Sequence, residues 1–266
     1  MQHLNRRQFL DHSLLAAGVL FALPRTGFSA IAPGVETVAA PLIAGEERNA
    51  QPDIWALEIN FKPIRMISAE ITDPKTGKTN KELVWYLAYR ALVRSTSGLP
   101  DSKGKTEDRP DFVPDFTLVV DGHRGMTVYE DRILPEAQAA INKREKHNYK
   151  NSVEIVGPLP KITPDRSKIW NSLDGVATWI GIDPDAVFIT IYMSGFSNGY
   201  KVSEGPDKQE IVTRRTLVQK FWRPGDRFDQ HEDEIRIADQ AVLRDWPGRV
   251  KKENEELENN PHWIYR

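Results

Sequence analysis

Residues 83–94, with the sequence LVWYLAYRALVR, constrain the fold of this chain more than any other stretch. Successive side chains of a β-strand point to opposite faces of the sheet. One face of a strand here is almost wholly apolar and carries Leu83, Trp85, Leu87, Tyr89, Ala91 and Val93. The opposite face mixes apolar, aromatic and charged side chains, namely Val84, Tyr86, Arg90 and Arg94. Because a strand with aromatic residues on both faces packs on both sides, we expect it to lie at the centre of a sheet.

Shorter stretches with strand-like patterns occur along much of the chain. They predict strands at residues 55–61, 116–120, 126–129, 152–156, 176–180, 187–193 and 216–222. The turn residues at 181–185 indicate that the strands on either side of them pair with each other. Since the strands are short and long βα alternation is missing, the sequence predicts a mainly β fold, an antiparallel immunoglobulin-like β-sandwich.

Two segments have helical patterns instead. Residues 135–147 begin with Pro135, which suits the first helical position, and place Ala137 and Ile141 on a small apolar face. We therefore expect one inserted surface helix laid over an edge or end of a sheet. Residues 250–257, VKKENEEL, predict a short C-terminal helix that is exposed to solvent.

The composition excludes several classes of protein. With 39% hydrophobic residues, the 266-residue chain is too apolar to be disordered. Its formal net charge of −2 provides no strong basic field, so nucleic acid is not an expected partner. The chain has no cysteine, which excludes disulfide bonds, thiolate nucleophiles, iron–sulfur clusters and a lipid-modified N-terminal cysteine.

Residues 1–32 have the three parts of an export signal, a polar start, an apolar stretch at 14–23 and a region of small residues. The apolar stretch is too short for the roughly 20 residues of a membrane-spanning helix, so no transmembrane span is expected after cleavage. The start resembles the twin-arginine export consensus at Arg6, Arg7, Phe9 and Leu10. This resemblance implies the twin-arginine translocation machinery as a partner and a periplasmic, extracellular or envelope-associated location. An ordinary first helix capped by Asn5 and an uncleaved signal anchor are the alternatives.

Changes in composition divide the rest of the chain into three parts. Residues 33–52 have no periodicity and indicate a linker. Residues 53–225 are expected to form the β-sandwich domain, and residues 226–266 a charged extension that packs back on it. Because the last residues are unusually aromatic, we expect Trp263 or Tyr265 to contact the sandwich.

An acidic stretch at residues 225–235, GDRFDQHEDEI, offers oxygen ligands for a hard cation such as calcium. The candidate ligands are Asp226, Asp229, His231 and Asp233. Their spacing differs from that of an EF-hand loop, and no two of the six histidines have the helical spacing of a metal site. A solvated acidic turn is the alternative, and the sequence predicts no cofactor beyond this calcium hypothesis.

The most distinctive internal stretch is SGFSNGY at residues 194–200. It lacks the Gly-x-Ser-x-Gly arrangement of a nucleophile elbow, and its Asn-Gly pair is a strong signal for a tight turn. It is interpreted either as a strand end that turns into a loop or as a binding loop with the contact residues Phe196, Asn198 and Tyr200. A hydrolase would need two carboxylates at a defined separation, for which the candidates are Asp111, Asp115, Glu130 and Asp131.

Several phrases of the sequence resemble a family of uncharacterised exported bacterial proteins, namely VWYLAYRALV, FVPDFTLVVD, ILPEAQAAINKRE, YMSGFSNGY, FWRPGDRF and WIYR. The resemblance covers most of residues 53–266 and implies an exported single domain without an established activity. We therefore expect an exported, non-catalytic binding or structural module of the cell envelope, with an envelope protein or polysaccharide as its partner. The alternatives are an exported hydrolase that uses carboxylates or a bound metal ion, and a subunit of a larger envelope complex.

Overall fold

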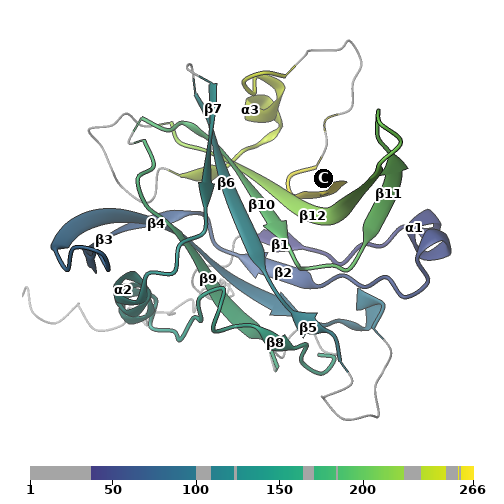
Figure 1. The fold of residues 1–266 in the computed structure, drawn as a ribbon, viewed down its shortest axis with the longest axis horizontal. Helices are drawn as coiled ribbons and strands as arrows, with labels where there is room; N and C mark the ends of the chain where they lie inside the picture. Colours follow the sequence, from purple (N-terminus) through teal and green to yellow (C-terminus); the bar gives the residue numbers. More distant parts are fainter. Residues whose placement is uncertain are drawn as a thin grey trace, which may run out of the picture. The chain divides into compact units, whose positions relative to one another are not determined.

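Two antiparallel sheets face each other across one hydrophobic core in the computed structural model (Figure 1). The structure describes residues 37–99, 109–122, 125–163, 171–183, 185–224, 235–249, 257 and 259–266. Within these residues strands far outnumber helices, and every pairing between named strands is antiparallel. The predicted mainly β, antiparallel architecture is therefore confirmed.

The first sheet is built around one long strand. Its members are β1 (Thr37–Ala39), β2 (Glu58–Phe61), β3 (Arg65–Thr72), β4 (Thr79–Leu92) and β9 (Leu173–Trp179). β4 pairs with β2, β3 and β9, and β1 pairs with β2. The central position that the alternating residues 83–94 predict is therefore confirmed.

The second sheet is built around another long strand, β12 (Glu210–Trp222). Its other members are β6 (Asp115–Gly122), β7 (Gly125–Glu130), β10 (Phe188–Ser194), β11 (Tyr200–Glu204), β13 (Arg236–Ile237) and β14 (His262–Tyr265). Leu217 of β12 pairs with Met193 of β10 and also with Trp263 of β14, so β10 and β14 lie on opposite edges of β12. A separate short pair joins β5 (Asp111–Phe112) to β8 (Gly157–Pro158).

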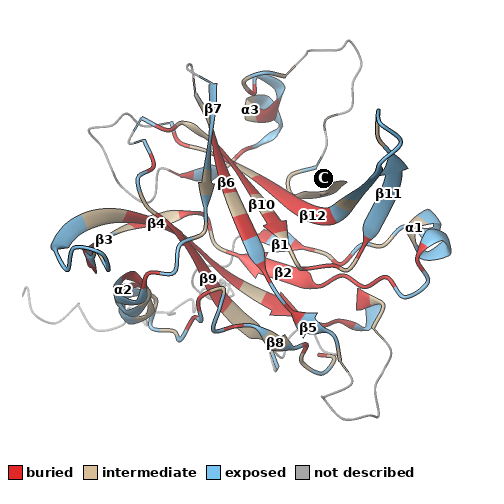
Figure 2. Cartoon of the chain, viewed as in Figure 1, coloured by how far each residue is buried: buried red, intermediate tan, exposed pale blue. Residues whose placement is uncertain are grey.

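Consecutive residues of β4 are buried along most of its second half, so side chains on both faces of the strand are covered (Figure 2). Trp85, Leu87 and Tyr89 point into the core that both sheets share. Val84 and Tyr86 point to the outer face and belong to two smaller clusters. Since burying one large apolar side chain contributes about 1.5–3 kcal/mol, this strand contributes more to stability than exposed ion pairs at about 0–1 kcal/mol each.

The outer face of the first sheet is covered by helix α2 (Pro135–Glu145). Ala137 and Ile141 are its buried residues, as the small apolar face predicts. The last turn is fixed by Glu145, whose carboxylate accepts hydrogen bonds from Arg65 at 3.0 Å and Tyr86 at 2.7 Å and also pairs with Lys62. The helix therefore lies on the face of the sheet rather than at its edge or end.

One expected strand and one expected strand pairing are wrong. Residues 152–156 form a turn, because the Asn151 side chain accepts hydrogen bonds from the backbone N–H groups of Val153 and Glu154 and competes with an extended backbone. The strands at 176–180 and 187–193 do not pair with each other. They correspond to β9 and β10, which lie in different sheets because each presents apolar residues to the shared core.

The linker assigned to residues 33–52 is also wrong over its described part. β1 pairs with β2, and residues Gly45–Ala50 form the short helix α1. Thr37 and Ala39 are buried and Val38 between them is exposed, which is the alternation of a strand. Three residues are too few for this alternation to be recognised in the sequence. Elements missed elsewhere include β3, the fully exposed β11 and the C-terminal β14.

The C-terminal part of the chain returns to the second sheet. Helix α3 (Gln240–Arg244) packs through Leu243 in a small cluster, and β14 pairs with β12. Trp263 packs against the main core, as the aromatic C-terminal residues predict. The helix expected at 250–257 falls outside the described residues except for position 257.

Candidate functional site

A cleft of about 920 Å³ opens beside helix α1, and we call it the α1 cleft. One wall of the cleft is formed by α1 and by the neighbouring residues 42–44, 51 and 54. The opposite wall is formed by β11, by Arg215 of β12, and by Trp263 and Tyr265 of β14. The β11–β12 hairpin projects beyond the shared core, so β11 and the residues of β12 that pair with it, 210–214, are largely exposed, whereas β12 is buried from Arg215 to Gln219 (Figure 2). The volume lies within the roughly 300–1,000 Å³ of small-molecule sites.

Arg215 lies at the base of the α1 cleft and is only 3% exposed. It occupies the same face of β12 as Leu217 and Phe221, which point into the core. Its Nε donates to Glu47 Oε1 at 3.0 Å, its Nη2 donates to the Leu42 carbonyl, and its guanidinium carbon lies 4.4 Å from the centre of the Trp263 ring. Its Nη1 is buried and has no hydrogen-bond partner among the described residues.

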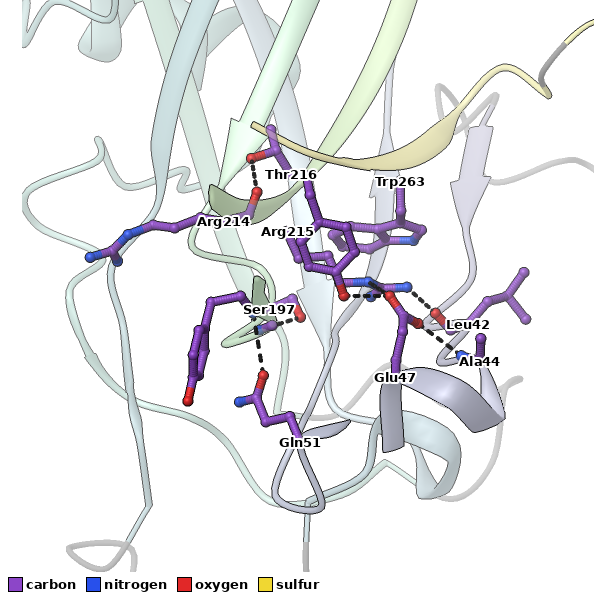
Figure 3. Close-up of polar contacts among 12 residues, drawn as sticks. Leu42, Ala44, Glu47, Gln51, Ser197, Arg214, Arg215, Thr216 and Trp263 are labelled. Carbon is purple, nitrogen blue, oxygen red and sulfur yellow. Dashed lines mark hydrogen bonds and ion pairs between the residues drawn. The ribbon is translucent and has the colours of Figure 1, made fainter. Parts of the chain in front are cut away.

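Glu47 connects α1 to the second sheet (Figure 3). Besides Arg215, its carboxylate accepts a hydrogen bond from the Tyr265 hydroxyl at 2.5 Å and one from the Ala44 backbone N–H at 2.8 Å. Burial alone raises the pKa of this carboxyl, but these donors and the Arg215 charge outweigh it, so the pKa lies below its usual value. Burial and the bond to Glu47 raise the pKa of Tyr265 to about 12, so the pair is a carboxylate and a neutral phenol at neutral pH.

Two cations lie against the aromatic rings of the α1 cleft. The Lys201 ammonium lies 4.2 Å from the centre of the Tyr265 ring, and Arg215 covers Trp263. Lys201 is exposed, whereas Arg215 is held by Glu47. The pairing of Arg215 with Glu47 leaves Lys201 as the accessible cation and Glu46 as the exposed anion of the cleft lining.

The rest of the α1 cleft is largely apolar. The apolar lining residues are Leu42, Ile43, Ala44, Ala50, Ile54 and Val202. Leu42 is 70% exposed and Val202 is 53% exposed, so both present apolar surface to solvent. The arrangement thus combines apolar walls with an Arg215–Glu47 ion pair at the base and with two exposed charges, Lys201 and Glu46.

The loop between β10 and β11 supports the α1 cleft from behind. Gly195 has a φ of +82°, and a Cβ there would lie 1.9 Å from the Val113 carbonyl oxygen, so a side chain is excluded. A Cβ on Gly199 would lie 2.8 Å from Arg215 Cδ. Gly199 therefore allows the close approach of the Arg215 side chain.

The three residues predicted for a binding loop have different positions. Phe196 is fully buried and packs edge-on against Tyr89, so its side chain is not accessible to a ligand. Asn198 makes structural contacts, since its Oδ1 accepts from the Trp55 N–H at 2.7 Å and its Nδ2 donates to the Asp53 carbonyl. Tyr200 is 52% exposed and lines both the α1 cleft and a smaller hollow of about 270 Å³.

Other predicted residues lie elsewhere or outside the described part of the chain. Two sets of predicted residues lie outside the described part of the chain. They are the calcium ligands Asp226, Asp229, His231 and Asp233 and the export residues Arg6, Arg7, Phe9 and Leu10. In the parts that the structure describes, no group of three or more His, Cys, Asp or Glu residues could hold a metal ion. No helix among those parts is long and apolar enough to cross a membrane.

Among the carboxylates considered for hydrolysis, Asp131 makes hydrogen bonds that serve to hold the fold together. Its Oδ1 accepts from the Thr178 N–H at 2.7 Å, and its Oδ2 accepts from the Ser152 hydroxyl. Burial raises the pKa of this carboxyl to about 6, although both hydrogen bonds lower it. These contacts fix the segment before α2 to β9, away from the residues that line the α1 cleft.

The residues of the α1 cleft were missed by sequence reasoning. One signal was present, because the alternation of β12 places Arg215 on the same side as Leu217 and Phe221. An arginine on an apolar face needs a partner, but Glu47 is 168 residues away in the sequence and was assigned to a linker.

No protein-family model, curated protein or solved structure matches the chain. The resemblance to a family of exported bacterial proteins therefore stays a prediction, and the functional argument depends on the geometry of the α1 cleft.

Proposed function

We propose that this chain is an exported, non-catalytic binding module of the cell envelope and that the α1 cleft is its ligand site. The observation that carries the proposal is the cleft of about 920 Å³, in which apolar walls lie beside the exposed Lys201 and the 52% exposed Tyr200. A concave site of this volume that combines apolar surface with a few polar groups is typical of ligand binding.

The export part of the proposal is supported by the N-terminal sequence. The twin-arginine-type signal at residues 1–32 implies transport by the twin-arginine machinery to the periplasm, the cell surface or the medium. The resemblance to exported bacterial proteins agrees with it. An immunoglobulin-like connectivity is also part of the proposal, supported by two antiparallel sheets around a shared core.

A subunit of a larger envelope complex is a second candidate, and the β11–β12 hairpin favours it. Val202 and Val212 pair across the hairpin, and both are more than half exposed. An edge strand can pair with a strand from another protein through its free backbone N–H and C=O groups, and exposed apolar side chains on it add contact area. An envelope protein is therefore the partner of this second candidate, whereas an envelope polysaccharide or small molecule is the ligand of the first.

Export is tested by fractionating cells that express the chain and by determining the mature N-terminus by mass spectrometry. Replacing Arg6 and Arg7 together with lysine should retain the protein in the cytoplasm, and a secreted double variant would contradict twin-arginine export. Binding is tested by the melting temperature of the mature protein in the presence of envelope polysaccharide and peptide fractions. A fraction that raises it should have less effect on Lys201→Glu than on the matched control Lys81→Glu in β4, and equal effects would exclude the α1 cleft.

A further inference from the structure

The α1 cleft has the chemistry of a site for an amphiphile rather than for a purely polar ligand. Six of its lining residues are aliphatic, and two of these that are more than half exposed, Leu42 and Val202, belong to opposite walls. An aliphatic chain between such walls removes apolar area from water at about 25 cal/mol per Å². A sugar, with a hydroxyl on nearly every carbon, would leave most of this surface without a matching contact.

The base of the cleft specifies the head group. Lys201 and Arg215 both carry N–H donors, and Arg215 Nη1 has no acceptor in the described part of the chain. Glu47, the nearest carboxylate, already accepts from Arg215 Nε, Tyr265 and Ala44. Glu47 offsets the charge of Arg215, so the exposed Lys201 is the donor that a head group with acceptor oxygens can contact.

The geometry also restricts how the head group enters. Arg215 is almost fully buried and its guanidinium carbon lies 4.4 Å from the centre of the Trp263 ring, while Lys201 is exposed above Tyr265. Lys201 is thus the first contact of an incoming anion, and Arg215 lies behind it. The Lys201 side chain is long and solvated, so it can leave the Tyr265 ring at small cost.

We infer that the α1 cleft binds an anionic amphiphile, an aliphatic chain with a carboxylate head group that contacts Lys201. This inference rests on the proposed binding function and specifies its ligand class. The aliphatic part lies between Leu42 and Val202, and the head group lies at the base of the cleft.

The experiment is isothermal titration of the mature protein with four probes below their micelle concentrations. The probes are dodecanoate, dodecyltrimethylammonium with the same chain, acetate with the same head group, and a neutral oligosaccharide. Dodecanoate should bind at least tenfold more tightly than dodecyltrimethylammonium, since one charge-assisted hydrogen bond accounts for about that ratio. It should also bind at least tenfold more tightly than acetate, since acetate has no chain to bury between the apolar walls. Lys201→Gln should weaken dodecanoate binding about tenfold by removing the charge, and Leu42→Ser should weaken it about tenfold by removing apolar contact.

Two control variants have the same changes at exposed positions on other strands, Lys81→Gln in β4 and Val128→Ser in β7. Both should bind dodecanoate like the unmodified protein. Equal affinities for the two dodecyl probes, or equal effects of test and control variants, would overturn the inference. If the oligosaccharide binds instead and Lys201→Gln weakens it, the ligand class is wrong but the binding function stands. If no probe binds and the envelope fractions also leave the melting temperature unchanged, both proposals fail.

Discussion

Replacing Asp131 with asparagine should make the protein more stable at neutral pH. The Asp131 carboxyl is buried between the Ser152 hydroxyl and the Thr178 N–H, and burial raises its pKa from 3.8 to about 6. An asparagine keeps both contacts, because its Oδ1 accepts from Thr178 and its amide donates to the Ser152 oxygen. The substitution therefore removes the buried charge and leaves the hydrogen bonds in place.

The sign and size of the effect follow from the two pKa values. Because the pKa of Asp131 is higher in the folded protein, the folded state holds more protons than the unfolded state between about pH 4 and pH 6. The free energy of unfolding contributed by this group therefore falls as the pH rises through that interval. At about 1.4 kcal/mol per pH unit, the full difference is about 3 kcal/mol, and relaxation around the charge reduces the expected gain to about 1–3 kcal/mol.

Urea denaturation from pH 4 to pH 8 measures the difference between Asp131→Asn and the unmodified protein. The difference should be close to zero at pH 4 and grow until about pH 7. Glu130→Gln, which changes the exposed neighbouring carboxylate in β7, is the matched control and should show no such rise. A constant difference across the range, or a variant that becomes less stable as the pH rises, would refute the reasoning.

Three further predictions concern the α1 cleft and helix α2. Glu47→Ala should lower the free energy of unfolding by about 3 kcal/mol in urea titrations, because it leaves the buried Arg215 without its counter-charge; a loss below about 1 kcal/mol would contradict this. Gly199→Ala should cost about 1–3 kcal/mol because its Cβ would meet Arg215 Cδ at 2.8 Å, whereas Gly45→Ala, which has no atom within 4 Å, should be tolerated in thermal melts. Glu145→Gln should destabilise the protein at pH 7 but much less at pH 3, since ion pairs and hydrogen bonds hold the pKa of this carboxyl below its usual value; an equal loss at both pH values would argue against the ionic contribution.

The parts of the fold that follow from local alternation were predictable. Residues 83–94 identify a strand covered on both faces, and the structure places it at the centre of the first sheet. The helix at 135–145 was predictable from Pro135 and its small apolar face. Local patterns failed where they were short or where a side chain competed with the backbone, as at β1 and at Asn151.

The candidate site was largely unpredictable for a different reason. The predicted loop residue Phe196 has the side-chain chemistry of a ligand contact but lies fully in the core. The residues that form the α1 cleft come from the segment at 42–54, from β11 and β12, and from the C-terminal β14. Their sequence neighbours have no shared pattern, so nothing local indicates that they meet.

The sequence by itself determined the strand-rich character of this protein, its lack of cysteine chemistry and the resemblance of its first residues to an export signal. These depend on composition and on the two-residue period of a strand, which are local properties. Only the tertiary structure decided which strands share a sheet and that Glu47 lies against Arg215. Strand pairing and the burial of a charge depend on contacts between residues far apart in the chain. These contacts stabilise the protein only once the core that brings the residues together has formed.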